Sequence, residues 1–133
     1  MKVQDNILII RLNNKKGEPN IDSLSKEDLY ERTRAAWDYS FQYLERATYA
    51  LAAFHGYVIE VYEIESWDYV INLNRPEPLH SIDIMGEKRK AFYGKVASEE
   101  VRQRYVGQSI KEFFKKGDQN PVKFIGIDGK GLN

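Results

Sequence analysis

The strongest constraint on the fold is a pair of β-prone runs on either side of residues 55 and 56. Tyr49–Phe54 is apolar, His55-Gly56 follows, and Tyr57–Glu65 is rich in β-branched and aromatic residues. Two such runs separated by two residues that end in glycine predict a β-hairpin, because glycine supplies the positive φ that a tight turn needs. A third run, Trp67–Leu73, predicts a further strand that extends the hairpin into a meander.

The remaining elements are predicted from local signals. Val3–Leu12 has a continuous Ile/Leu centre, which is typical of a strand buried on both faces. Ser25 precedes acidic residues and predicts the N-cap of a helix that ends near Ala36 or Trp37. The segment 38–46 suits either a short strand or a short helix. Later elements are expected as a strand at Arg89–Val96, a helix from Ser98 to Gly107, a short helix after the capping box Ser109–Glu112, and a strand at Val122–Ile127.

The order strand, helix, three-strand meander, strand, helix, strand indicates an α+β fold. The strands are expected to be mostly antiparallel, and five or six short strands predict a small open β-barrel flanked by helices. A length of 133 residues with 42% hydrophobic residues suits a single domain, which we expect at residues 1–127. Residues 128–133 are expected to form a flexible C-terminal tail.

Composition excludes several classes of site. The absence of cysteine excludes disulfides, thiolate zinc sites, iron–sulfur clusters and cysteine nucleophiles. The apolar run Ile7–Ile10 is too short for a signal-peptide core or a membrane span, so we expect a soluble cytoplasmic protein without a membrane partner. The nearest His/Asp pair, His80 and Asp83, lies in a predicted loop, and neither a nucleophile elbow nor a phosphate loop is present. We therefore expect no catalytic residues, no metal site and no cofactor.

Two segments have a loose similarity to nuclease motifs. Asp83 with Glu87-Lys88-Arg89 follows an Asp…Glu-x-Lys pattern only in part, because arginine stands at the last position. Gly56-Tyr57-Val58 and Tyr105-Val106-Gly107 are similar to the two tripeptides of GIY-YIG nucleases but lie far apart in the sequence. An enzyme, whether a nuclease or one that acts on a small carboxylate or nucleotide, is therefore the less favoured interpretation.

The net charge of zero conceals an uneven distribution. Eleven of the 20 Lys and Arg residues lie from residue 88 onward, together with only five of the 20 Asp and Glu residues. The run Lys88-Arg89-Lys90, with Lys95 close by, predicts a set of side chains that contact phosphates. The alternative is that these charges are ordinary solvated surface.

A small set of aromatic and arginine side chains predicts a ligand site. Trp37 and Trp67 have broad rings that can stack on a nucleobase, and Tyr93 can lie near either of them. Arg34 stands close to Trp37 in the sequence and can bond to a phosphate or a base edge. The alternatives are that the tryptophans fill the core and that Arg34 pairs with Glu31 or Asp38.

Several of these segments together resemble a widespread, poorly characterised bacterial domain. The similarity is carried by Tyr30–Trp37 and Tyr49–Trp67, then by Phe92-Tyr93-Gly94 and the stretch Tyr105–Phe124. Such domains occur fused to GIY-YIG-type nucleases, so the resemblance implies a nucleic-acid context.

The predicted layout also resembles the PUA-like group, which includes EVE and YTH domains. These are small β-barrels that bind RNA or modified bases in a cage of aromatic side chains. The resemblance implies that Trp37, and less securely Trp67, belong to such a cage. We therefore expect a non-enzymatic domain that binds DNA or RNA and recognises a modified or flipped base. The competing hypothesis is a protein-interaction or regulatory module with a protein partner or a second copy of the chain.

Overall fold

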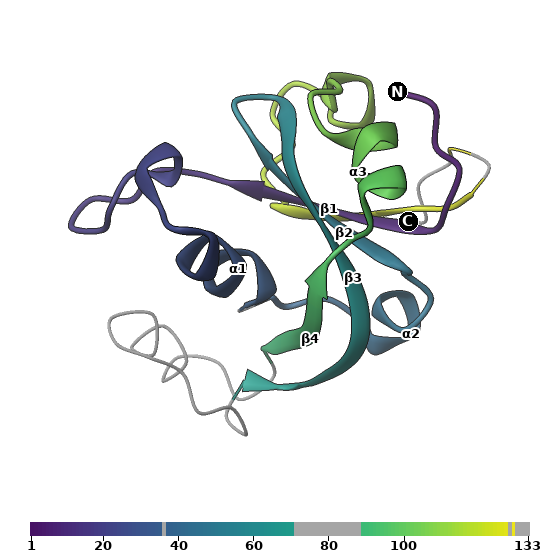
Figure 1. Cartoon of the computed structure of the whole chain (residues 1–133), viewed down its shortest axis with the longest axis horizontal. Helices are drawn as coiled ribbons and strands as arrows, with labels where there is room; N and C mark the ends of the chain where they lie inside the picture. The colour runs from purple at the N-terminus through teal and green to yellow at the C-terminus, as the bar shows by residue number, and fades with distance from the viewer. Residues whose placement is uncertain (36, 71–88, 128, 130–133) are drawn as a thin grey trace.

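The computed structural model describes residues 1–35, 37–70, 89–127 and 129 of the chain. Its strands and helices form an α+β arrangement, as the sequence predicts (Figure 1). The strands are β1 (Ile7–Leu12), β2 (Tyr49–Phe54), β3 (Tyr57–Tyr69), β4 (Lys90–Val96) and β5 (Val122–Ile125). The helices are α1 (Lys26–Arg34), α2 (Phe41–Leu44) and α3 (Glu99–Tyr105), with 3₁₀ turns η1 (Ile21–Ser23) and η4 (Lys111–Phe113).

The five strands form one mixed sheet in the order β4-β3-β2-β1-β5. β1 and β2 run parallel, whereas the other neighbouring pairs are antiparallel. Within the described part of the chain, β4 and β5 are the two edges and do not pair with each other. The prediction of mostly antiparallel strands is confirmed, but the sheet stays open and does not close into a barrel.

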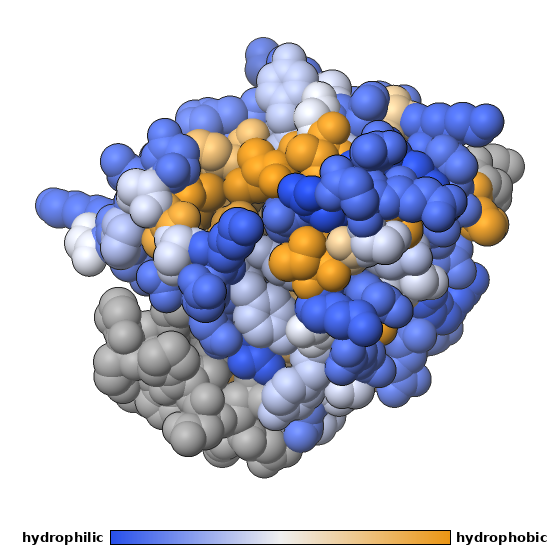
Figure 2. Space-filling model, viewed as in Figure 1, coloured by the Kyte–Doolittle hydropathy of each residue, from blue (hydrophilic) through white to orange (hydrophobic). Residues whose placement is uncertain are grey.

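The core lies on both faces of the sheet because β1 is buried on both sides. Leu8 and Ile10 pack in a cluster with residues from α1 and α2, while Ile7 and Ile9 pack in a second cluster with residues from α3. α1 and α3 accordingly lie on opposite sides of the sheet (Figure 1). The exposed surface is mostly hydrophilic on the face drawn in Figure 2, and apolar side chains show where α3 meets the β2–β3 hairpin.

The predicted meander is wrong, because Trp67 belongs to the same strand as Tyr57. β3 is one strand of 13 residues, and its register with β4 shifts between Ile64 and Ser66. The shift has a consequence for packing: Tyr62, Ile64 and Trp67 all contact the same core cluster, although a regular strand would turn Trp67 to the other face. Trp67 is thus directed into the core by a β-bulge.

Helix ends follow the predicted capping residues. Ser25 Oγ accepts a hydrogen bond from Asp28 N at 3.1 Å, and Ser98 Oγ accepts one from Val101 N at 3.4 Å. The segment left open between strand and helix forms α2. The helix expected after Ser109 is only the 3₁₀ turn η4, and β1 and β5 are shorter than predicted. The predicted loop at residues 74–86 lies outside the described residues.

Tyr105 of α3 holds the N-terminal segment by two hydrogen bonds. The Tyr105 hydroxyl donates to Asp5 Oδ2 at 2.6 Å and accepts from Gln4 N at 3.1 Å. Burial of the phenol, reinforced by the hydrogen bond to Asp5, raises the pKa of Tyr105 to about 12. Folding therefore favours the protonated hydroxyl.

This contact predicts how stability changes at alkaline pH. An unfolded tyrosine has a pKa near 10, so the contribution of Tyr105 is complete below about pH 10 and is lost as the pH rises towards 12. In urea denaturation at pH 8 and pH 11, the wild type should lose about 1 kcal/mol more unfolding free energy than Tyr105→Phe. Equal losses in the two proteins would contradict the role assigned to this hydroxyl.

Candidate functional site

The structure brings the four predicted ligand-binding residues to the first half of β4, which we call its aromatic end. Trp67 lies opposite Phe92 in the β3–β4 register, and the two rings meet edge to face with centroids 5.4 Å apart. Arg34 Nε donates to Phe92 O at 2.8 Å. The guanidinium carbon of Arg34 lies 4.8 Å from the centroid of the Tyr93 ring, which is a cation–π contact.

Trp37 lies at the same end of β4 but is attached through its backbone. Its N–H donates to Lys90 O and its carbonyl accepts from Lys90 N, both at 2.9 Å. The indole Nε1 donates to Thr33 O at 2.8 Å, so this polar group is already satisfied. Together with the hydrogen bond from Gly94 N to the Tyr30 hydroxyl, these contacts cover the outer edge of β4.

The burial of this aromatic end differs from residue to residue. Trp37 and Trp67 are half-buried against the core cluster below α1, and Tyr93 is 42% exposed. Arg34 is only 5% exposed and pairs with Glu31 at 3.2 Å, one of the alternatives left open by the sequence. Two buried donors, Arg34 Nη2 and Trp67 Nε1, have no hydrogen-bond partner in the part of the chain that the structure describes. Unsatisfied buried donors are uncommon in proteins and indicate either strain or an absent acceptor.

The predicted phosphate-contacting residues do not form one exposed strip. Lys90 is 8% exposed, its Nζ donates to Tyr39 O at 2.8 Å, and it lies 5.0 Å from the centroid of the Phe41 ring. Lys95 is exposed and lies 4.0 Å from Glu63 Oε2 on the neighbouring strand. Arg89 is half-buried just before β4, and Lys88 lies outside the described residues. The structure thus gives Lys90 an internal contact where the sequence predicts a surface one.

The two lysines should respond differently to substitution. Lys90→Ala removes the donor to Tyr39 O and the stem that packs beside Phe41, so the unfolding free energy should fall by about 1–3 kcal/mol. Lys95→Ala should change the unfolding free energy by no more than about 0.5 kcal/mol, because its ion pair is exposed. Urea denaturation of both variants at pH 7 measures the difference, and similar losses would contradict the internal placement of Lys90.

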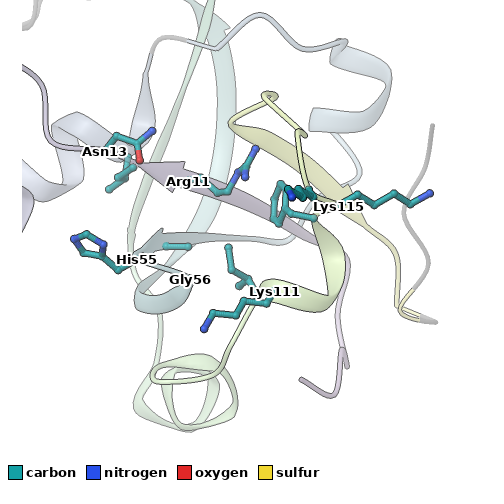
Figure 3. Close-up of a pocket in the computed structure, with 11 residues that line it drawn as sticks. Arg11, Asn13, His55, Gly56, Lys111 and Lys115 are labelled. Atoms are coloured by element: carbon teal, nitrogen blue, oxygen red, sulfur yellow. The ribbon is translucent and has the colours of Figure 1, made fainter.

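A different surface gathers exposed cationic side chains around a pocket of about 330 Å³ (Figure 3). Because β1 and β2 run parallel, their carboxyl ends lie side by side, with Leu12 paired to Phe54 at the last position of each strand. The pocket lies there, between the end of β1, the β2–β3 turn and the chain that follows η4. In open α/β sheets, ligands commonly bind beyond the carboxyl ends of parallel strands, and the parallel pair of this sheet has the pocket at that place.

The β2–β3 turn brings η4 to the pocket. His55 and Gly56 have φ values of 53° and 85°, as a two-residue hairpin turn of this kind requires. Gly56 O accepts from Ile110 N at 3.0 Å, which holds the start of η4 against the turn. A Cβ at Gly56 would lie 2.9 Å from Lys111 Cε, so the lysine stem packs directly on the glycine. Figure 3 shows Lys111 beside this turn.

The lining of the pocket is cationic. Arg11 comes from β1, Lys111 from η4, and Lys115 and Lys116 from the chain after it, whereas no aspartate or glutamate is among the lining residues. The three lysines are exposed, and none forms an ion pair with a described residue. Charges this close act together, since the Debye length at physiological salt is about 8 Å.

Arg11 is the rigid member of this group. Its Nη2 donates to Asp118 O at 2.8 Å and Asn120 O at 2.6 Å, and its guanidinium carbon lies 3.9 Å from the centroid of the Phe114 ring. The buried Nε has no hydrogen-bond partner among the residues that the structure describes. The Asp118 carboxylate accepts from Lys123 Nζ at 3.2 Å, and this hydrogen bond lowers the pKa of Asp118 below its ordinary value. The same carboxylate lies 3.9 Å from Arg11 Nη2, so Asp118 pairs with Lys123 and with Arg11.

The sequence prediction missed the pocket because its cations come from segments far apart in the chain. Arg11 stands more than ninety residues from Lys111 and is brought close only by the sheet. Part of the signal was present in Lys115-Lys116-Gly117, directly after the predicted short helix. A sequence shows only which cations are close along the chain. It therefore favours the consecutive cations at 88–90 as the phosphate site over the separated cations of the pocket.

No group of three or more His, Asp or Glu side chains that could hold a metal ion occurs among the residues the structure describes. Over the same residues, every helix is too short or too polar to cross a membrane. The chain matches no protein-family model, no curated protein and no solved structure.

Proposed function

We propose that this chain is a non-enzymatic nucleic-acid-binding domain whose cationic pocket holds the phosphates of a single strand of DNA or RNA. The observation that carries the proposal is the lining itself: four cationic side chains from three segments surround a pocket that no carboxylate lines. Phosphate contacts from Lys and Arg supply most of the affinity of proteins for nucleic acids, independently of sequence. A chain without net charge can bind in this way when its cations are concentrated locally.

An exposed aromatic ring beside the pocket supports a single-stranded ligand. Tyr57 is 46% exposed, and Lys111 Nζ lies 5.1 Å from the centroid of its ring. Proteins that bind single strands combine cations that follow the backbone with aromatic side chains on which bases stack. Lys111 and Tyr57 provide this combination on adjoining elements.

The aromatic end of β4 supplies the second part of the proposal, the recognition of a base. Arg34 Nη2 and Trp67 Nε1 are buried donors without a hydrogen-bond partner among the described residues. Carbonyl or ring-nitrogen acceptors of a nucleobase would satisfy them when the side chains that cover them move aside. Trp67 lies ten residues after Tyr57 on β3, which at roughly 3.3 Å per residue separates the two ends by about 30 Å. The two ends therefore contact different nucleotides of one strand. In this proposal, the aromatic end of β4 has the role of the aromatic cage of PUA-like domains.

The phosphate contacts predict a strong salt dependence that the pocket variants reduce. Binding of a fluorescein-labelled single strand is measured by anisotropy between 50 and 200 mM salt. Each lost phosphate contact lowers the log–log salt slope by roughly 0.7, so Lys111→Gln/Lys115→Gln should lower it by about 1.4. The matched control Lys26→Gln/Lys95→Gln removes the same charge from exposed positions outside the pocket and should leave the slope close to that of the wild type.

Equal effects of the two double variants would contradict the location of the phosphate site. A wild-type chain that binds neither DNA nor RNA, yet forms a stable dimer in light scattering, would favour the protein-interaction alternative instead. Binding of both DNA and RNA with the same loss in the pocket variant would support contacts to the backbone rather than to the sugar.

The base contact has its own test in Trp67→Phe. This variant keeps an aromatic ring against Phe92 but removes the Nε1 donor. If that donor binds a base, affinity for a strand long enough to reach both ends should fall about fivefold, the equivalent of one hydrogen bond. The salt slope should not change, because no phosphate contact is removed. An unchanged affinity in a folded variant would contradict the base-binding role.

A further inference from the structure

His55 occupies the first position of the hairpin turn that forms one wall of the pocket. Its φ of 53° lies in the left-handed region, which few non-glycine residues adopt and where asparagine, aspartate and histidine are enriched. Asparagine suits the same backbone, so the imidazole can be removed without changing the turn.

The imidazole lies on the rim of the pocket in a restricted orientation. His55 lines the pocket together with Gly56 and Lys111 and is exposed to solvent. Its ring centroid lies 3.9 Å from that of Phe54, with an angle of 60° between the planes. Figure 3 shows His55 extending from the hairpin turn, with Lys111 on the other side of Gly56, against which its stem packs.

The charged side chains that line the pocket with His55 are all cationic. Arg11 comes from β1, Lys111 from η4, and Lys115 and Lys116 from the segment after it.

Two carboxylates on these segments are paired with cations. Glu112 pairs with the amino group of Met1, and Asp118 pairs with Lys123 and, at 3.9 Å, with Arg11 of the pocket. Because no aspartate or glutamate lines the pocket, a bound anion would be the counter-charge of a protonated His55.

We propose that His55 is an affinity-determining contact of the pocket, whose protonated imidazole donates a hydrogen bond to a phosphodiester oxygen beside Lys111. This inference rests on the proposed function, that the pocket holds nucleic-acid phosphates. Imidazole is the side chain that gains charge between pH 8 and pH 5. The pocket then binds a single strand more tightly as the pH falls, and binding is accompanied by uptake of a proton.

The test measures affinity for an oligothymidylate without terminal phosphates at pH 5.5 and pH 8.0, at one ionic strength. Its bases and phosphodiesters keep the same charge at both pH values, whereas a terminal phosphate would titrate in this range. The wild type should bind about fivefold more tightly at pH 5.5, as expected for one added charge-assisted contact on an exposed surface.

His55→Asn is the informative variant because asparagine keeps the left-handed turn and the fold. It should bind with nearly the same affinity at both pH values, because it lacks the imidazole. His80→Asn, which changes the other histidine of the chain, is the matched control and should retain the pH dependence of the wild type.

Three outcomes would overturn the inference, and one of them would also overturn the proposed function. A wild type that binds equally at both pH values, or a His55→Asn variant that retains the full dependence, removes the role of His55 and leaves the phosphate pocket in place. Absence of binding at both pH values overturns the proposed function and the role of His55 together.

Discussion

The parallel pairing of β1 with β2 is the constraint on which the rest of the structure depends. Parallel neighbours cannot be joined by a hairpin and need a long crossover, which here runs from residue 13 to residue 48 and contains α1 and α2. Burial of Ile7–Ile10 on both sides of the sheet requires a second layer, which α3 supplies on the opposite face. The same pairing places the carboxyl ends of β1 and β2 side by side, and the pocket lies beyond them. The layers and the candidate site thus share one cause.

Elements whose signals are local were predictable from the sequence, and contacts between distant segments were not. The hairpin at His55-Gly56 and the caps at Ser25 and Ser98 depend on neighbouring residues only, and all three are present in the structure. The bulge in β3 is different, because it is set by pairing with β4 and not by any residue pattern around Ile64. One inserted residue reverses the alternation of side chains along β3. Trp67 therefore packs on the core from within β3, and the sequence pattern cannot show this reversal.

The candidate site shows the same limit. Lys88, Lys90 and Lys95 are neighbours in sequence, but along a strand the even and odd positions face opposite ways, so Lys90 is enclosed while Lys95 is exposed. Arg34 was expected to be available to a ligand, yet most of its guanidinium is taken up by the edge of β4 and by Glu31. Charge type is visible in a sequence, whereas the direction of a side chain depends on its register.

Net neutrality and a cationic pocket are compatible because the two operate over different distances. The acidic excess before residue 88 contributes little at the pocket once it lies beyond one Debye length, about 8 Å at physiological salt. A molecule arranged in this way lacks long-range attraction to any polyanion, so its encounters with nucleic acid are slower than those of a basic domain. In the proposed function, its affinity for a nucleic acid comes from close contacts of Arg11 and the lysines that line the pocket. Such contacts depend on the geometry of the β2–β3 turn, which makes the identity of the residue at position 55 matter more than the total charge.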